Sequence, residues 1–347
     1  MFRFLKWLVV SVLIVSLATA AAVAAWLFSP LSLNKTTLDV SIEPGTSVRQ
    51  MAQLLVKEGV DTDPDWLWLW FRLSGQSRQL KAGNYELQRG ITPYDLLNKI
   101  AAGDEDLRRL SLIEGWTFKQ FREALNKASD LKHLTAQMSD EEVMSQLGRP
   151  GLLPEGRFYP DTYAYGKSST DLALLTRALK AMDQRMTKAW AMRHQPSVLT
   201  SPEEMLILAS IVEKETGRRE DRDRVSAVFH NRLAIDMPLQ TDPTVIYGLF
   251  DQYQGRLRRA DLTQDHPWNT YTRKGLPPTP IAMPGWASLV AAVQPAKTQD
   301  LYFVARGDGS SEFSQTLQEH NQAVDTYIRR KFKPSETRRD TRPGSAP

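Results

Sequence analysis

The length, composition and charge of the chain limit its number of domains and exclude several kinds of functional site. Its 347 residues have room for about two domains, each able to bury a core. The net charge is +4, but residues 329–347 carry seven Lys/Arg and two Asp/Glu, so the remainder is close to neutral and an extended nucleic-acid-binding face is not expected. The absence of cysteine excludes disulfides, thiolate metal sites and cysteine nucleophiles, and the five histidines lack metal-ligand spacing. We expect no metal ion, no cofactor and no nucleic-acid partner.

The N-terminus is predicted to be a membrane anchor. Residues 1–6 carry Arg3 and Lys6, and an apolar run follows over residues 7–28, long enough to cross a hydrocarbon layer about 30 Å thick. Positive charge on the N-terminal side places residues 1–6 in the cytoplasm and the rest of the chain outside. A cleaved signal peptide is the alternative, because residues 18–25 contain AxA-like sites. We favour the anchor, since the run exceeds the usual signal core of about 7–15 residues.

Residues 37–105 are predicted to form a small α+β module. Residues 37–44 alternate apolar and polar side chains as a half-buried strand does, and residues 80–87 indicate a second strand or a hairpin. Helices opened by Ser47, Pro64 and Thr92 are predicted over residues 48–59, 64–75 and 93–103. This order resembles LysM-like modules, which hold sugar polymers, and a spacer without a ligand is the alternative. The alternating Trp66, Trp68 and Trp70 would spread around a helix, which favours packing over a sugar platform.

Residues 106–150 are predicted to connect this module to a second domain over residues 151–331. Within the second domain, the loop LLPEGRFYPDTYAYG, residues 152–166, contains two prolines and two glycines and is not a regular helix. Its aromatic rings and acids, Glu155 among them, suit either a sugar-binding loop or a rigid, packed one. Residues 169–193 then show the apolar spacing of a long amphipathic helix.

An apolar helix from Met205 to Val212 runs into two acids, Glu213 and Glu215. Burying an unpaired carboxylate raises its pKa, and a carboxylic acid that is neutral near pH 7 can act as a general acid. Residues two apart point about 200° apart on a helix, so only one acid can share the face of Leu208, Ile211 and Val212. That acid is Glu215, which we prefer. Solvated acids at a helix end, paired with neighbouring basic residues, are the alternative.

The remainder of the second domain offers further polar candidates. A helix is predicted from Asp221, and the segment after it presents Gln240 and Asp242, the latter as a second carboxylate, a substrate ligand or a helix cap. The proline- and glycine-rich loop over residues 268–285 carries Asn269 and Tyr271, and long ordered loops are often functional. A hairpin with a GDGS turn is predicted over residues 301–316, then a helix from His320 to about residue 331, and a disordered basic tail over residues 332–347.

Six motifs stand in a fixed order behind the N-terminal apolar run. They are EGRFYPDTY, LASIVEKET, VFHNRL, LQTDPTVIYG, NTYTRKGLPP and YFVARGDGSSEFSQT with a following HN. Together they resemble the MltG (YceG-like) family of endolytic murein transglycosylases, and the resemblance covers nearly all of residues 7–330. One departure is Thr279, which stands where the family loop usually has glycine.

The resemblance implies an α+β protein with a single transmembrane helix in the inner membrane. It implies a LysM-like subdomain and a mixed α/β catalytic domain in the periplasm, facing the peptidoglycan. The implied reaction cuts the β-1,4 bond between N-acetylmuramic acid and N-acetylglucosamine in nascent glycan strands and leaves 1,6-anhydro ends, near peptidoglycan synthases. As aligned, the second acid of VEKET, Glu215, is the catalytic residue.

One carboxyl group suffices for this reaction, first as acid and then as base, whereas glycoside hydrolases usually need two carboxylates. We assign substrate positioning to other polar residues of the second domain, which are Glu155, Gln240, Asp242, Asn269 and Tyr271. Two other functions are possible on this sequence: a hydrolytic muramidase in which Glu213 or Asp242 activates water, and a non-catalytic glycan-binding scaffold of the wall-synthesis machinery.

Overall fold

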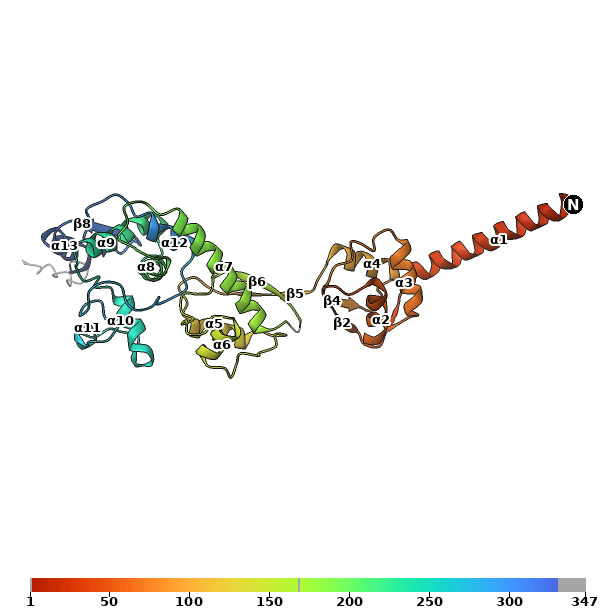
Figure 1. Ribbon diagram of the computed structural model, residues 1–347, viewed down its shortest axis with the longest axis horizontal. Helices are drawn as coiled ribbons and strands as arrows, with labels where there is room; N and C mark the ends of the chain where they lie inside the picture. Colours follow the sequence, from red (N-terminus) through yellow and green to blue (C-terminus); the bar gives the residue numbers. More distant parts are fainter. Residues whose placement is uncertain (1, 168, 330–347) are drawn as a thin grey trace, which may run out of the picture. The chain divides into compact units, whose positions relative to one another are not determined.

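The computed structural model describes residues 2–167 and 169–329, so the predicted basic tail, residues 332–347, lies outside the described residues. The chain is α+β and divides into two compact units (Figure 1). The first unit comprises Met1–Leu110, Ala128–Lys132 and Ala164–Thr170, and the second comprises Ser111–Lys127, His133–Tyr163 and Asp171–Pro347.

Helix α1, Phe2–Leu27, contains the predicted apolar run. Within its segment Leu5–Leu27, an 18-residue window has a mean hydropathy of 2.5 and is not buried, so the length and composition of the segment allow it to cross a membrane. A signal sequence has the same features.

The first unit is built around the antiparallel pair β2, Thr37–Ile42, and β4, Gly83–Gln88. Alternate residues of β2 are buried, as the sequence pattern predicts. The remaining elements are the short pair β1, Ser32–Leu33, and β3, Val60–Asp61, and the helices α2, Val48–Glu58, α3, Pro64–Leu73, and α4, Pro93–Ala102. The predicted caps are confirmed: the side chains of Ser47 and Thr92 accept backbone N–H groups of α2 and α4.

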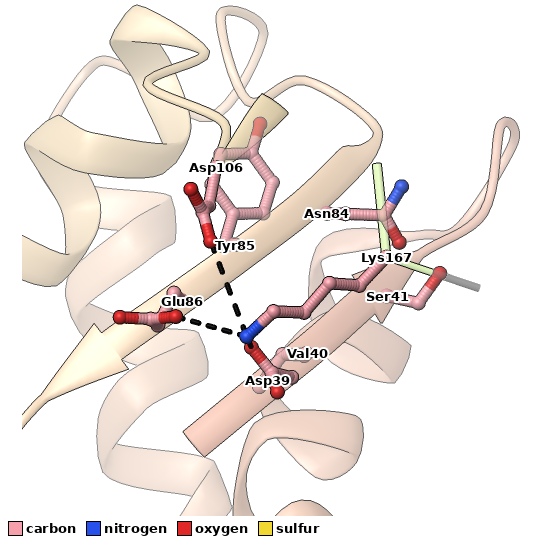
Figure 2. Close-up of a pocket in the computed structure, with 8 residues that line it drawn as sticks. All are labelled: Asp39, Val40, Ser41, Asn84, Tyr85, Glu86, Asp106 and Lys167. Atoms are coloured by element: carbon pink, nitrogen blue, oxygen red, sulfur yellow. Dashed lines mark hydrogen bonds and ion pairs between the residues drawn. The ribbon is translucent and has the colours of Figure 1, made fainter. Parts of the chain in front are cut away.

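Lys167 ties a late segment of the chain to this early sheet. Its Nζ atom lies 2.8 Å from a carboxylate oxygen of Asp39 on β2 and 2.9 Å from one of Glu86 on β4. Asp106 is the third acid around it, at 4.0 Å, and Figure 2 shows the ammonium group between the three carboxylates. These hydrogen bonds lower the pKa of Glu86 and raise that of Lys167. They explain why residues 164–170 belong to the first unit.

The residues of the predicted connecting region, 106–150, are divided between the two units. Strand β5, Leu107–Ser111, pairs with β6, Thr162–Gly166, and the division between the units falls within these strands. Helices α5, Phe118–Lys127, and α6, Asp140–Gln146, belong to the second unit. The residues between them are held without regular structure, partly by the buried Asp171, which accepts the backbone N–H groups of Leu134 and Thr135.

The second unit is mainly helical and contains less strand than a mixed α/β domain. Besides α5 and α6, its helices are α7, Asp171–Ala191, α8, Pro202–Glu215, α9, Arg222–Ala234, α10, Asp242–Leu249, α11, Arg259–Thr263, α12, Trp286–Val293, and α13, Leu317–Val324. The 3₁₀ turns Arg219–Asp221 and Phe250–Gln252 and the π turn Asp325–Arg329 are also part of this unit. Helix α8 is central, with α7, α9, α10 and α12 packed against it.

The predicted hairpin is confirmed as β7, Tyr302–Ala305, paired with β8, Ser311–Ser314. The last helix begins three residues earlier than the predicted start at His320. Thr316 accepts the N–H of Glu319, and the Glu319 carboxylate accepts that of Thr316, so a capping box fixes the start at Leu317.

Candidate active site

The two predicted acids, Glu213 and Glu215, lie in the last turn of helix α8. The sequence argument placed Glu215 on a more apolar row than Glu213, but every residue from Met205 to Val212 is buried. Both rows therefore face the core, because helices surround α8, and row polarity alone does not separate the acids. Thr216 has an extended backbone, with φ −142° and ψ 126°, which ends the helix directly after Glu215.

Glu213 is held by a structural network. Its side chain is 7% exposed, lies 3.8 Å from the Arg222 guanidinium and accepts the backbone N–H of Gly285 at 2.9 Å. A Cβ atom at Gly285 would lie 1.9 Å from a carboxylate oxygen of Glu114, so a larger residue there would displace the Glu114 side chain. Burial and then the neighbouring Glu213 raise the pKa of Glu114. Glu213 therefore fastens the loop before α12 to the end of α8.

Glu215 lies at a cleft of about 400 Å³ within the second unit. Burial raises the pKa of its carboxyl group to about 7, and the charge of Asp242 contributes in the same direction. The hydroxyl of Thr241, which donates a short hydrogen bond to Oε1, and the charge of Arg232 act in the opposite direction. A substantial fraction of Glu215 is thus protonated near pH 7, as general acid catalysis requires.

The cleft is lined by polar side chains and by aromatic and apolar ones. The polar side chains are Glu215, Arg232, Gln240, Asp242, Tyr271 and His320. The other lining residues are Phe229, Leu239, Tyr302, Phe303 and Leu317. Rings and apolar walls beside convergent polar groups are the composition expected of a site for a polar organic ligand such as a sugar.

Backbone contacts between two loops place the polar residues at the cleft. Gln240, with φ at +49°, donates its backbone N–H to the carbonyl of Thr270 at 3.0 Å. The next residue, Thr241, donates its N–H to the hydroxyl of Thr270 at 3.1 Å and is buried. These contacts fix the Thr241 hydroxyl toward Glu215 and start α10 at Asp242, which is the first helical residue rather than the predicted cap.

Asp242 and Tyr271 form a direct pair. The Tyr271 hydroxyl donates to Oδ1 of Asp242 at 2.6 Å. Burial, and then Asp242, raise the pKa of Tyr271, so the phenol stays protonated and remains a donor. Asp242 itself is exposed, so the pair is accessible to a ligand.

Two predicted site residues lie outside the cleft lining. Glu155 is 7% exposed and accepts the N–H of Phe118 at the start of α5, at 3.1 Å, while burial raises its pKa to about 8. Asn269 is fully buried and donates to three backbone carbonyls, those of Asp261, Leu262 and Gln264. Both side chains therefore hold loops in place, and the structure does not bring them together with Glu215.

Among the lining residues that were not predicted from the sequence, three carry polar groups: Arg232, Tyr302 and His320. Arg232 is 7% exposed and donates to the carbonyls of Leu239 and Leu301, at 2.8 and 2.7 Å. A signal for it exists, since it follows Phe229 by three residues on the apolar row of α9. Tyr302 and His320 stack with ring centroids 5.2 Å apart, and nothing in the local sequence pattern joins them.

No three His, Asp or Glu side chains within residues 2–167 and 169–329 gather closely enough to hold a metal ion.

Comparison with known proteins relates the chain to one protein family. Residues 40–326 match the model of the YceG-like family. An endolytic murein transglycosylase of Bacillus subtilis is 31% identical, with 85% of this chain and 86% of the relative aligned. An endolytic murein transglycosylase of Streptococcus pneumoniae is 28% identical over 87% of this chain, which spans only 61% of that relative.

A solved structure is also similar. The crystal structure of a yceG-like protein from Listeria monocytogenes aligns with a TM-score of 0.52 and 31% identity, covering 84% of this chain and 99% of that one. The family match over most of the chain agrees with the likeness in sequence and fold, and the chain therefore belongs to the YceG-like family.

Proposed function

We propose that the protein is a membrane-anchored lytic transglycosylase that cuts the bond between N-acetylmuramic acid and N-acetylglucosamine in peptidoglycan. Membership of the YceG-like family and the names of its relatives support the reaction class. The observation that carries the assignment of residues is the Glu215 carboxyl, which has a pKa of about 7 and opens to a cleft.

In the proposed mechanism, Glu215 is the single proton-transfer group. Its neutral carboxyl protonates the glycosidic oxygen as the bond from C1 to that oxygen breaks. The resulting carboxylate then takes the proton from the C6 hydroxyl of the same muramic acid residue, whose oxygen attacks C1 and closes the 1,6-anhydro ring. No water is consumed, and the carboxyl regains its proton.

The other lining residues have supporting parts in this proposal. The Thr241 hydroxyl donates to Glu215 and stabilises the carboxylate after the first proton transfer. Tyr271 and Asp242 offer a donor and an acceptor for sugar hydroxyls, and Gln240 adds an exposed amide. Glu155 and Asn269 are no longer proposed as substrate ligands, since their hydrogen bonds are made within the protein.

Helix α1 supports the proposed location. We propose that it remains as an anchor in the inner membrane, with both units in the periplasm close to newly made glycan strands and to the synthases that make them. The basic residues at its N-terminal end support this orientation. Alkaline extraction of membranes tests the anchor, because a chain released from the membrane would rule it out.

The test of the reaction compares two isosteric substitutions two residues apart. Glu215→Gln keeps the shape of the side chain but removes the transferable proton, so cleavage of nascent glycan should fall by about 10²–10⁴-fold. Glu213→Gln is the matched control, because an amide oxygen still accepts the N–H of Gly285, and its activity should stay within a few fold. Equal activity of Glu215→Gln and wild type would overturn the assignment.

A hydrolytic muramidase remains the second candidate because Asp242 lies in the same cleft and could activate water. Product masses decide between the two reactions. Anhydro ends are lighter than reducing ends by one water, so reducing ends alone would favour hydrolysis. Retention of glycan without any product, with no effect of Glu215→Gln, would instead favour the non-catalytic scaffold.

A further inference from the structure

Helix α3 has two apolar faces, although the core of its unit uses only one. Leu67 and Phe71 are fully buried in that core. Trp66, Leu69 and Leu73, at spacings of 3 and 4, form a second stripe and are 55%, 38% and 73% exposed. A helix that only covers a core carries a single apolar stripe, and a contiguous exposed one marks an interaction surface.

The exposed stripe begins where α1 ends. The ring of Trp66 lies 6.3 Å from that of Trp26 in the last turn of α1. On α4, Tyr94 lies 5.4 Å from Phe28, the residue that follows α1, and both are largely exposed. Figure 1 shows α3 and α4 on the side of their unit at which α1 ends. The aromatic rings and the stripe therefore form one continuous apolar surface around the end of the helix.

The length of α1 determines where this apolar surface lies relative to the lipid bilayer. The apolar segment Leu5–Leu27 has 23 residues. At a rise of about 1.5 Å per residue it is about 34 Å long, close to the hydrocarbon thickness of about 30 Å. When one end of the segment lies at one boundary of the bilayer, Trp26 and Phe28 lie at the other. Trp and Tyr side chains concentrate at that boundary, because their rings are apolar and their tips are polar.

Side chains of both charge signs lie beside the stripe. Binding to a membrane would therefore depend on burial of the apolar side chains and not on attraction to anionic lipid. Arg49 and Arg72 lie over the ring of Trp68, at 5.3 and 5.5 Å from its centroid. Asp65 pairs with Arg49 at 3.1 Å. Charges of both signs thus border the stripe, as on an amphipathic helix that lies in the interface between water and acyl chains.

We propose that this surface, called the interfacial face and made of Trp26, Phe28, Trp66, Leu69, Leu73 and Tyr94, rests in the headgroup layer of the bilayer that α1 spans. The small module then lies on the membrane instead of extending away from it. This inference rests on the proposed retention of α1 as an anchor, which alkaline extraction tests separately.

The lack of cysteine permits a direct test on the full chain, since a single introduced cysteine is the only thiol to label. Leu73→Cys places a fluorophore on the interfacial face. Glu43→Cys is the control, because Glu43 is exposed, follows the end of β2 and is not part of the interfacial face. Each protein is reconstituted into phosphatidylcholine vesicles with or without doxyl-labelled lipid.

We expect the doxyl lipid to reduce the fluorescence of the label at position 73 about twofold and that at position 43 very little, since the quencher lies within the bilayer. Adding Trp66→Ser and Leu69→Ser should diminish the quenching at position 73. A label at 73 that responds only to a water-soluble quencher would overturn the inference while leaving an extraction-resistant anchor intact. A label shielded from both quenchers would overturn it in favour of a protein partner.

Discussion

The pKa of Glu215 predicts an unusual stability change for Glu215→Gln. A carboxyl group that ionises near 4.5 in the unfolded chain and at about 7 in the folded one opposes folding above pH 4.5, because the unfolded state loses its proton first. This penalty is complete above pH 7 and absent below about pH 4. The amide of glutamine never ionises, so the substitution removes the penalty.

The shift from 4.5 to about 7 corresponds to about 3 kcal/mol, as an upper limit, since the variant also changes the contact with Thr241. For a unit of this size, each kcal/mol raises Tm by about 2–4 °C. We therefore expect Glu215→Gln to melt up to about 10 °C higher than wild type at pH 8 and at the same temperature at pH 4.

The assay is thermal unfolding of the full chain in detergent, followed by tryptophan fluorescence, at pH 4, 6 and 8. Glu213→Gln is the control, and it should be less stable than wild type at pH 8 because its buried ion pair with Arg222 is removed. A stability difference for Glu215→Gln that does not grow between pH 4 and pH 8 would refute the reasoning, because the carboxyl would then not be buried in its charged form at a cost.

Three further outcomes are expected. Cleavage should decline as pH rises through about 7, because the Glu215 carboxyl loses its proton. Thr241→Val should move this decline to higher pH, since it removes a hydrogen-bond donor that favours the carboxylate. The pH–rate profiles of both proteins check this, and a decline at the same pH in the variant and wild type would contradict it. Tyr271→Phe should lower kcat/KM about tenfold with little change in Tm, whereas unchanged kinetics would remove the Tyr271–Asp242 pair from substrate binding. Lys167→Met should destabilise the small unit by about 1 kcal/mol at pH 7 in denaturant titrations. That loss should shrink as pH falls below 4.5, because the pKa of Glu86 is lowered in the folded chain and its carboxylate is protonated at low pH; a loss that does not shrink with falling pH would contradict the ionic explanation.

The sequence by itself determined the local elements and the chemistry to look for. Alternation in residues 37–44 gave a strand with one buried face, and Ser47 and Thr92 start helices where their side chains cap free N–H groups. The apolar run at the N-terminus determined a helix long enough for a membrane. These features depend on neighbours within a few residues, so periodicity and capping chemistry are sufficient to predict them.

Only the tertiary structure decided which polar residues share the cleft. Helical spacing places Glu213 and Glu215 on different faces of α8, but α8 is buried on all sides, so the face alone does not tell the two acids apart. Their hydrogen-bond partners do: Gly285 donates to Glu213 and Thr241 donates to Glu215, and both partners come from segments distant in the sequence. Glu155 is directed to the start of α5 for the same reason. Spacing reports which face of an element is buried, but the group that meets a side chain there depends on how separate elements pack, and no local pattern encodes it.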